Sequence, residues 1–112
     1  MNGASKTSRI QDRDGAGSIT GNFELKNLAS RTQLPNVKLL IHGRSDMEHL
    51  IEIYVGKNPK SLRLVNVLAI SRFSPAAFSF DLKPGDTDAE NKGIISLITV
   101  HPRPEGALNL WL

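Results

Sequence analysis

Short apolar runs alternate with breaks rich in Gly, Pro, Asn and Asp from Ile19 to the end of the chain. Within several runs, large apolar and polar side chains alternate with a period of two, the spacing of a strand with one buried face. The runs that we expect to form strands are 19–28, 37–42, 48–55, 62–71, 77–82, 94–101 and 107–112. They predict an all-β fold, a small antiparallel β-sandwich or barrel of about seven strands.

Two runs differ in how they distribute their apolar residues. In 77–82, Phe78, Phe80 and Leu82 alternate with polar side chains, which predicts one face in the core. The run 62–71 is apolar on both faces, a pattern typical of a central strand that is covered on both sides. We therefore expect 62–71 to lie in the interior of a sheet.

The segment 46–55 fits two structures. Ile51, Ile53 and Val55 alternate with Glu52 and Tyr54, which favours a strand. The preceding sequence Ser-Asp-Met-Glu has the spacing of a helix capping box, and an apolar helical face would follow it. An α+β fold with one helix near 46–55 is therefore the alternative to the all-β prediction.

The first eighteen residues carry few apolar side chains, with Ile10 the only large one after Met1. A segment that buries so little apolar surface cannot offset the ~1–2 kcal/mol per residue that backbone ordering costs. We therefore divide the chain into a flexible polar N-terminal arm, residues 1–18, and a single β domain, residues 19–112. Further along, Pro84-Gly85 predicts a type II turn, because Pro sets the first φ and Gly supplies the positive one.

Composition excludes several classes of protein. The chain has 112 residues and no cysteine, which rules out disulfides, zinc sites built on thiolates and thiol catalysis. No apolar run reaches the ~18–20 residues of a membrane span, and the arm lacks the apolar stretch of a secretory signal. We expect a soluble protein of the cytoplasm or of a virion, without a membrane partner.

Catalytic and metal-binding motifs are missing from the sequence. There is no Gly-x-Ser-x-Gly, phosphate loop or dinucleotide motif, and His42, His49 and His101 stand too far apart for a local ligand pair. Asp86-x-Asp88-x-Glu90 has the acidic spacing of a calcium loop, yet Asn91 and Leu97 occupy the positions of its glycine and bidentate glutamate. We predict no enzyme, no metal and no cofactor.

Charge is distributed unevenly along the chain, whose formal net charge is +3. Residues 26–72 carry eight bases and three acids, whereas residues 73–112 carry three bases and five acids. Bases gathered in or beside loops can contact phosphates. The residues of the predicted polyanion-binding face are Arg44, Lys57, Lys60, Arg63 and Arg72.

The last apolar run reaches the end of the chain, and apolar residues near a chain end are usually tied down. We predict that Leu108, Leu110, Trp111 and Leu112 form an interaction surface. Together these features predict a non-enzymatic structural or protein–protein interaction module, such as a self-assembling subunit of a virus or phage. A nucleic-acid or polyanion-binding β domain is the alternative, and a small ligand-binding domain or enzyme is the second alternative.

Overall fold

The computed structural model describes residues 9–11, 18–25, 36–44, 46–100 and 108–111, and every structural statement below concerns these ranges. Within them no helix is long and apolar enough to cross a membrane. The described residues form eight strands: β1 (Arg9–Gln11), β2 (Ser18–Glu24), β3 (Asn36–Gly43), β4 (His49–Gly56), β5 (Leu62–Ile70), β6 (Ala76–Asp81), β7 (Lys92–Thr99) and β8 (Leu108–Trp111).

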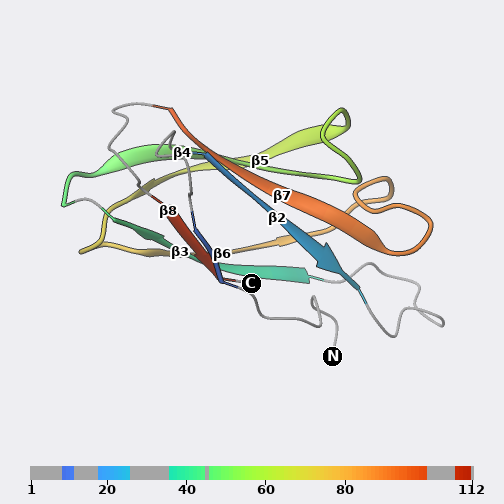
Figure 1. Ribbon diagram of the computed structural model, residues 1–112, viewed down its shortest axis with the longest axis horizontal. Helices are drawn as coiled ribbons and strands as arrows, with labels where there is room; N and C mark the ends of the chain where they lie inside the picture. The colour runs from blue at the N-terminus through green and yellow to red at the C-terminus, as the bar shows by residue number, and fades with distance from the viewer. Residues whose placement is uncertain (1–8, 12–17, 26–35, 45, 101–107, 112) are drawn as a thin grey trace.

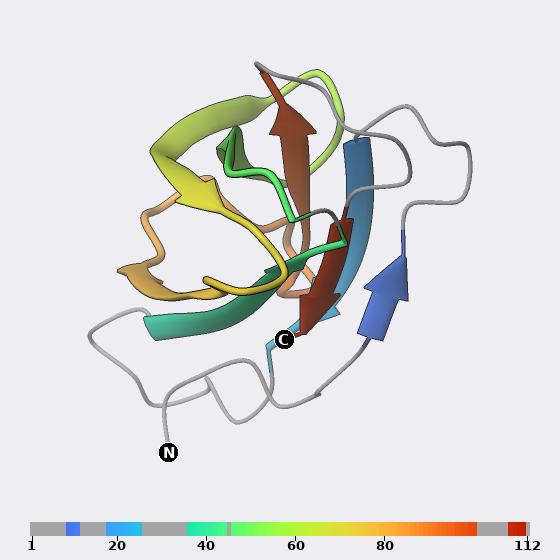
Figure 2. The ribbon, with the colours of Figure 1, turned by 90° about the vertical axis from the view of Figure 1, so that its left-hand side faces the viewer.

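The strands form two four-stranded antiparallel sheets (Figure 1). One has the order β1-β8-β3-β6 and the other has the order β2-β7-β4-β5. Figure 2 shows the strands of both sheets around a common interior. The all-β prediction is confirmed at this level.

The helix that we considered near 46–55 is wrong. Residues 49–56 form β4, which pairs with β5 on one side and β7 on the other, so its backbone groups are satisfied by neighbouring strands. Ile51, Ile53 and Val55 are all 0% exposed on one face of this strand. The apparent capping box lies in the connection before β4, where Asp46 pairs with Arg72.

The predicted number of strands, about seven, is also wrong. The additional strand is β1, inside the predicted arm; the rest of residues 1–18, apart from Ser18 at the start of β2, lies outside the described ranges. Arg9–Gln11 pair with residues 109–111 of β8. Three residues are too short to show a periodic pattern, and their partner lies at the other end of the chain, so local sequence gave no sign of the pairing.

The core is one cluster that receives side chains from both sheets. The period-two pattern of the sequence explains it, because alternate residues of each strand point to the same face. Phe80 and Leu82 are buried as expected, at 8% and 5% exposure, and Phe78 packs against the cluster. The rings of Phe78 and Phe80 stack with centroids 6.0 Å apart.

The strand that we expected in the interior of a sheet, β5, is instead at an edge. Among the described strands it pairs with β4 alone, and β4 covers only one of its sides. Its outer face is open, since Leu64 is 50% and Val67 is 41% exposed. An apolar pattern on both faces therefore did not mean burial on both faces.

The turn predicted at Pro84-Gly85 is present. The φ of Gly85 is 94°, in the left-handed region that glycine favours. The N–H of Asp86 donates to the carbonyl of Lys83 over 3.0 Å, which closes the four-residue turn. This turn carries Asp86 toward β5.

Candidate interaction surface

The outer face of the β2-β7-β4-β5 sheet is apolar at one end. Leu50 of β4 lies opposite Ala69 of β5, and its carbonyl accepts a hydrogen bond from the N–H of Val100 over 2.9 Å. In the next row, Glu52 lies between Val67 of β5 and Ile98 of β7. Four of these side chains are large, apolar and about 40% exposed: Leu50 43%, Val67 41%, Ile98 39% and Val100 41%.

Glu52 is the one acid within these apolar rows. The hydroxyl of Tyr54 donates to its Oε1 over 2.9 Å. Hydrogen bonding to the carboxylate raises the pKa of Tyr54 above its ordinary value. The two polar groups thus satisfy one another along the same strand and leave the surrounding side chains apolar.

Two loops extend the apolar rows beyond the strand ends. Met47 precedes β4 and is 59% exposed, and Phe73 follows β5 and is 69% exposed, more than any other large apolar side chain that the structure describes. The loops lie side by side. A Cβ on Gly43 would come within 2.8 Å of the Cα of Ser71.

The turn that carries Phe73 is tied to the side chain of Ser71, which is buried. The Oγ of Ser71 accepts hydrogen bonds from the N–H groups of Phe73, at 3.2 Å, and Ser74, at 3.1 Å. The backbone groups of Ser71 and Ser74 also bond to each other in both directions. A turn fixed in this way presents Phe73 with little conformational freedom left to lose.

Arg72 joins the two loops. Its Nε pairs with Oδ1 of Asp46, and its guanidinium carbon lies 4.9 Å from the centroid of the Phe73 ring. Both partners of the ion pair are more than half exposed. The pair therefore orients side chains more than it stabilises the fold.

We name this surface the apolar end; it comprises Met47, Leu50, Val67, Phe73, Ile98 and Val100. The charged side chains around it are balanced. Arg44 and Arg72 are two bases, and Asp46 and Glu48 are two acids on the same pair of loops. Aromatic, methionine and arginine side chains are the types that protein interfaces enrich.

The five predicted polyanion-binding residues do not form one face. Arg44 and Arg72 lie at the apolar end, whereas Lys57 and Lys60 lie in the turn at the opposite end of β4 and β5. Arg63 is engaged in a bidentate contact with Asp86, from Nε to Oδ1 and from Nη2 to Oδ2, each 2.8 Å long. The exposed bases of the predicted set therefore form two separate pairs, Arg44 with Arg72 and Lys57 with Lys60.

The predicted C-terminal interaction residues lie within a sheet. Leu108, Leu110 and Trp111 belong to β8, which pairs with β1 on one side and β3 on the other. Leu112 lies outside the described residues. Since both sides of β8 are paired within the chain, this arrangement leaves no free edge of β8 for another subunit's sheet.

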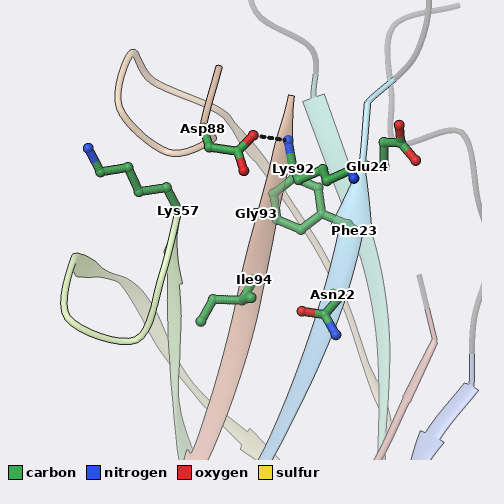
Figure 3. Close-up of a pocket in the computed structure, with 8 residues that line it drawn as sticks. All are labelled: Asn22, Phe23, Glu24, Lys57, Asp88, Lys92, Gly93 and Ile94. Carbon is green, nitrogen blue, oxygen red and sulfur yellow. Dashed lines mark hydrogen bonds between the residues drawn. The ribbon is translucent and has the colours of Figure 1, made fainter. Parts of the chain in front are cut away.

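At the other end of the same sheet a groove of about 400 Å³ opens. Its side chains include Asn22, Glu24, Lys57, Asp88, Lys92 and Ile94, with the ring of Phe23 among them (Figure 3). Figure 3 shows Lys57 on the far side from Asn22 and Glu24. Because the polar lining side chains are all exposed, the groove lacks the desolvated polar group that fixes a small ligand.

The acids of the β6–β7 connection bond to the protein itself. Asp86, 4% exposed, holds Arg63 and also accepts the N–H of Lys83 over 2.7 Å. Asp88 accepts the N–H groups of Lys92, at 3.0 Å, and Glu90, at 2.8 Å. These hydrogen bonds, that from Lys92 most of all, lower the pKa of Asp88. The carboxylates of Asp86 and Asp88 therefore stabilise the conformation of this connection.

The two histidines within the described ranges belong to different sheets. His42 lies in β3 and is partly exposed, whereas His49 lies in β4 and is 1% exposed. In the described part of the chain, no three His, Asp or Glu side chains gather closely enough to hold a metal ion. His101 lies outside that part.

Comparison of the chain with protein-family models, with curated protein sequences and with solved structures found no match.

Sequence reasoning missed the apolar end as a surface. The sequence pattern places Leu50, Val67 and Ile98 in predicted strands and assigns no role to Phe73. One signal was present in the sequence: the apolar residues on both faces of 62–71. Such a strand is either covered by its own fold or exposed toward a partner, and only the position of β5 decides between them.

Proposed function

We propose that this protein is a non-enzymatic association module that binds a second copy of itself through the apolar end. The supporting observation is the position of Phe73. Its side chain is 69% exposed, yet its turn is tied by Ser71 and its ring is covered on one side by Arg72. A fixed, exposed aromatic beside an arginine is the kind of group that dominates binding energy at an interface.

The adjoining sheet face supports the same function. Leu50, Val67, Ile98 and Val100 form adjacent rows around Glu52, and the loops of Met47 and Phe73 adjoin the ends of β4 and β5 on this side. Contiguous apolar patches on monomeric proteins are usually small, and larger ones mark binding sites. This face therefore provides apolar side chains at the same end of the sheet as the Phe73 anchor.

The charges favour a second copy as the partner. Two bases and two acids surround the apolar end and Glu52 lies within it, so the surface carries charges of both signs. When copies meet about a two-fold axis, each patch faces itself, and a patch of one sign would repel its partner. Here Arg44 or Arg72 of one copy can face Asp46 or Glu48 of the other.

We propose further that the two sheets pack as a β-sandwich, which gives the surface a rigid base. The core cluster contains side chains from both sheets, and the sheets adjoin at both lateral edges, where β1 lies near β2 and β5 lies near β6. Packing of two apolar sheet faces in this way is the usual solution for antiparallel sheets. A rigid base keeps the ordering cost of association low.

The test is the mass in solution as a function of concentration, measured by sedimentation for the wild type, Phe73→Ser and Leu40→Ser. Leu40 is the matched control, because it is 41% exposed on the outer face of the other sheet. We expect a concentration-dependent dimer that Phe73→Ser weakens at least about tenfold, as for an interface hot spot. Leu40→Ser should leave the dimer unchanged.

Two outcomes would contradict self-association through the apolar end. One is a monomer at every concentration. The other is equal loss of dimer in Phe73→Ser and Leu40→Ser. The same measurement with added RNA tests the polyanion alternative. A mass increase with RNA that falls steeply with salt, and is abolished by reversing the charges of Lys57 and Lys60, would favour nucleic-acid binding instead.

A further inference from the structure

The edge of β5 has features that oppose the addition of another strand. Among the described strands, β5 is the last of its sheet. An open strand edge presents a row of N–H and C=O groups and can pair with another chain. With nine residues, β5 is the longest strand described, and its exposed Leu64 and Val67 would make such pairing favourable.

One backbone donor on this edge is already occupied. The N–H of Val67 donates to Oδ1 of the preceding side chain, Asn66, over 2.8 Å. In an antiparallel strand, successive N–H groups point alternately toward the two neighbouring strand positions. The side chain of Asn66 thus takes the place that the carbonyl of an incoming strand would occupy.

The pairing of β5 with β4 is irregular at the same point. Ile53 lies opposite Asn66 and Tyr54 lies opposite Leu64, so Val65 is an extra residue on β5. An extra residue of this kind bends and twists its strand and interrupts the regular ladder. A regular strand added to the β5 edge could not keep its hydrogen-bond register past Val65.

Arg63 of β5 also contacts β6, the adjacent edge strand of the other sheet. Its Nη2 donates to the carbonyl of Asp81 in β6 over 3.3 Å, while the same guanidinium holds Asp86. Among the described strands, β6 is the last of its own sheet. A side chain of β5 therefore occupies a carbonyl of β6 and links the two edges.

We infer that Asn66 is a guard residue that prevents β5 from pairing with the β5 strand of another copy. The extra residue Val65 in β5 and the hydrogen bond from Arg63 to the carbonyl of Asp81 also hinder the addition of a strand on this side of the molecule. Because pairing through the β5 edge is prevented, two copies associate through the apolar end instead. The inference that the β5 edge is blocked does not depend on the proposed function. Only the conclusion that copies then associate through the apolar end rests on it.

The test compares Asn66→Val with Asn22→Val. Asn22 is the matched control because it is an exposed asparagine on β2, the strand at the opposite edge of the same sheet. The first measurement is hydrogen exchange at the amide of Val67. In dilute protein, before copies pair, loss of its hydrogen bond to Asn66 should speed exchange about fivefold to tenfold in Asn66→Val. Asn22→Val should leave it unchanged.

The second measurement is the mass in solution, each variant being made in the wild-type and Phe73→Ser backgrounds. Asn66→Val should form species larger than those of the wild type, and these should persist in the Phe73→Ser background because they use the edge. If Asn66→Val speeds exchange at Val67 without new species, or if Asn22→Val produces the same species, the guard role is overturned. Failure of the proposed function appears separately, as a wild-type protein that stays monomeric.

Discussion

The two ends of the β2-β7-β4-β5 sheet each carry an ion pair, but the pairs differ in burial. At the groove end, Arg63 and Asp86 are 32% and 5% exposed, and the contact is bidentate. At the apolar end, Arg72 and Asp46 are 54% and 59% exposed. Water screens the exposed pair, whereas burial of Asp86 shields much of the bidentate contact with Arg63 from solvent.

The difference in burial indicates that the two ends of the sheet have different roles. At the groove end, the buried Asp86 and the exposed Asp88 bond to Arg63 and to backbone N–H groups of their own loop. The apolar end uses its charges to orient Phe73 and leaves its large apolar side chains exposed. One end maintains the fold, and we propose that the other makes contacts.

Truncation of the core should affect both ends together and give the largest effect. Phe80 is buried in the cluster on which both ends rest. Phe80→Ala should lower the free energy of unfolding by about 3–5 kcal/mol, as measured by denaturant unfolding. A loss below about 1 kcal/mol, the scale of an ordinary surface change, would show that Phe80 is not packed in the core.

Removal of the inward-facing acid should damage only the groove end. Asp86→Ala leaves the guanidinium of Arg63 without its carboxylate and the N–H of Lys83 without its acceptor. We expect a loss of about 2–4 kcal/mol, since Arg63 is partly exposed and water can replace some contacts. Association measured by sedimentation should persist at temperatures where the variant is folded.

Removal of the outward-facing acid should change stability little. Asp46→Ala breaks the exposed pair with Arg72, for which we expect a change within about 0.5 kcal/mol. Chemical denaturation of this variant beside Asp86→Ala measures the contrast directly. Equal losses in the two variants would remove the distinction between the ends.

Two titratable groups, Asp88 and Tyr54, should respond at opposite limits of pH, with the smallest effects. Hydrogen bonds from the backbone of Lys92 and Glu90 lower the pKa of Asp88, so its contribution is present above the ordinary value of 3.8 and is lost as pH falls through the lower folded value. The contact with Glu52 raises the pKa of Tyr54, so its contribution is present below 10.0 and is lost as pH rises through the higher folded value.

Unfolding curves taken across both pH ranges test this expectation. Asp88→Asn should remove part of the acid-side dependence and leave the alkaline side intact, and Tyr54→Phe should do the reverse. Because both groups are exposed, each difference should be a slight change of slope. The same slope change in both variants on both sides would contradict the assignment.

Much of the fold followed from local pattern. Alternation in 77–82 correctly placed Phe80 and Leu82 in the core, and Pro84-Gly85 correctly located a turn. Alternation of Ile51, Ile53 and Val55 outweighed the capping-box spacing before it, because β5 and β7 bury that face and satisfy the backbone. These predictions succeeded where the periodicity extended over several residues.

The surfaces could not be predicted in the same way. The five candidate bases are grouped in the sequence, yet the eight-residue strand β4 places Lys57 at the opposite end of the sheet from Arg44. Arg63 is bound by Asp86, which lies 23 residues further along the chain. The apolar end joins residues from β4, β5, β7 and two loops. Contacts of this separation depend on register and on strand order, which local propensity does not encode.

The sequence by itself determined that this chain is built of strands and which side of most strands is apolar, since a period of two is a property of the extended backbone. Only the tertiary structure decided which apolar sides meet solvent. β5 has apolar residues on both faces, and its place at the edge of a sheet leaves one of them open. Burial depends on what packs against a face, and that is set by residues elsewhere in the chain.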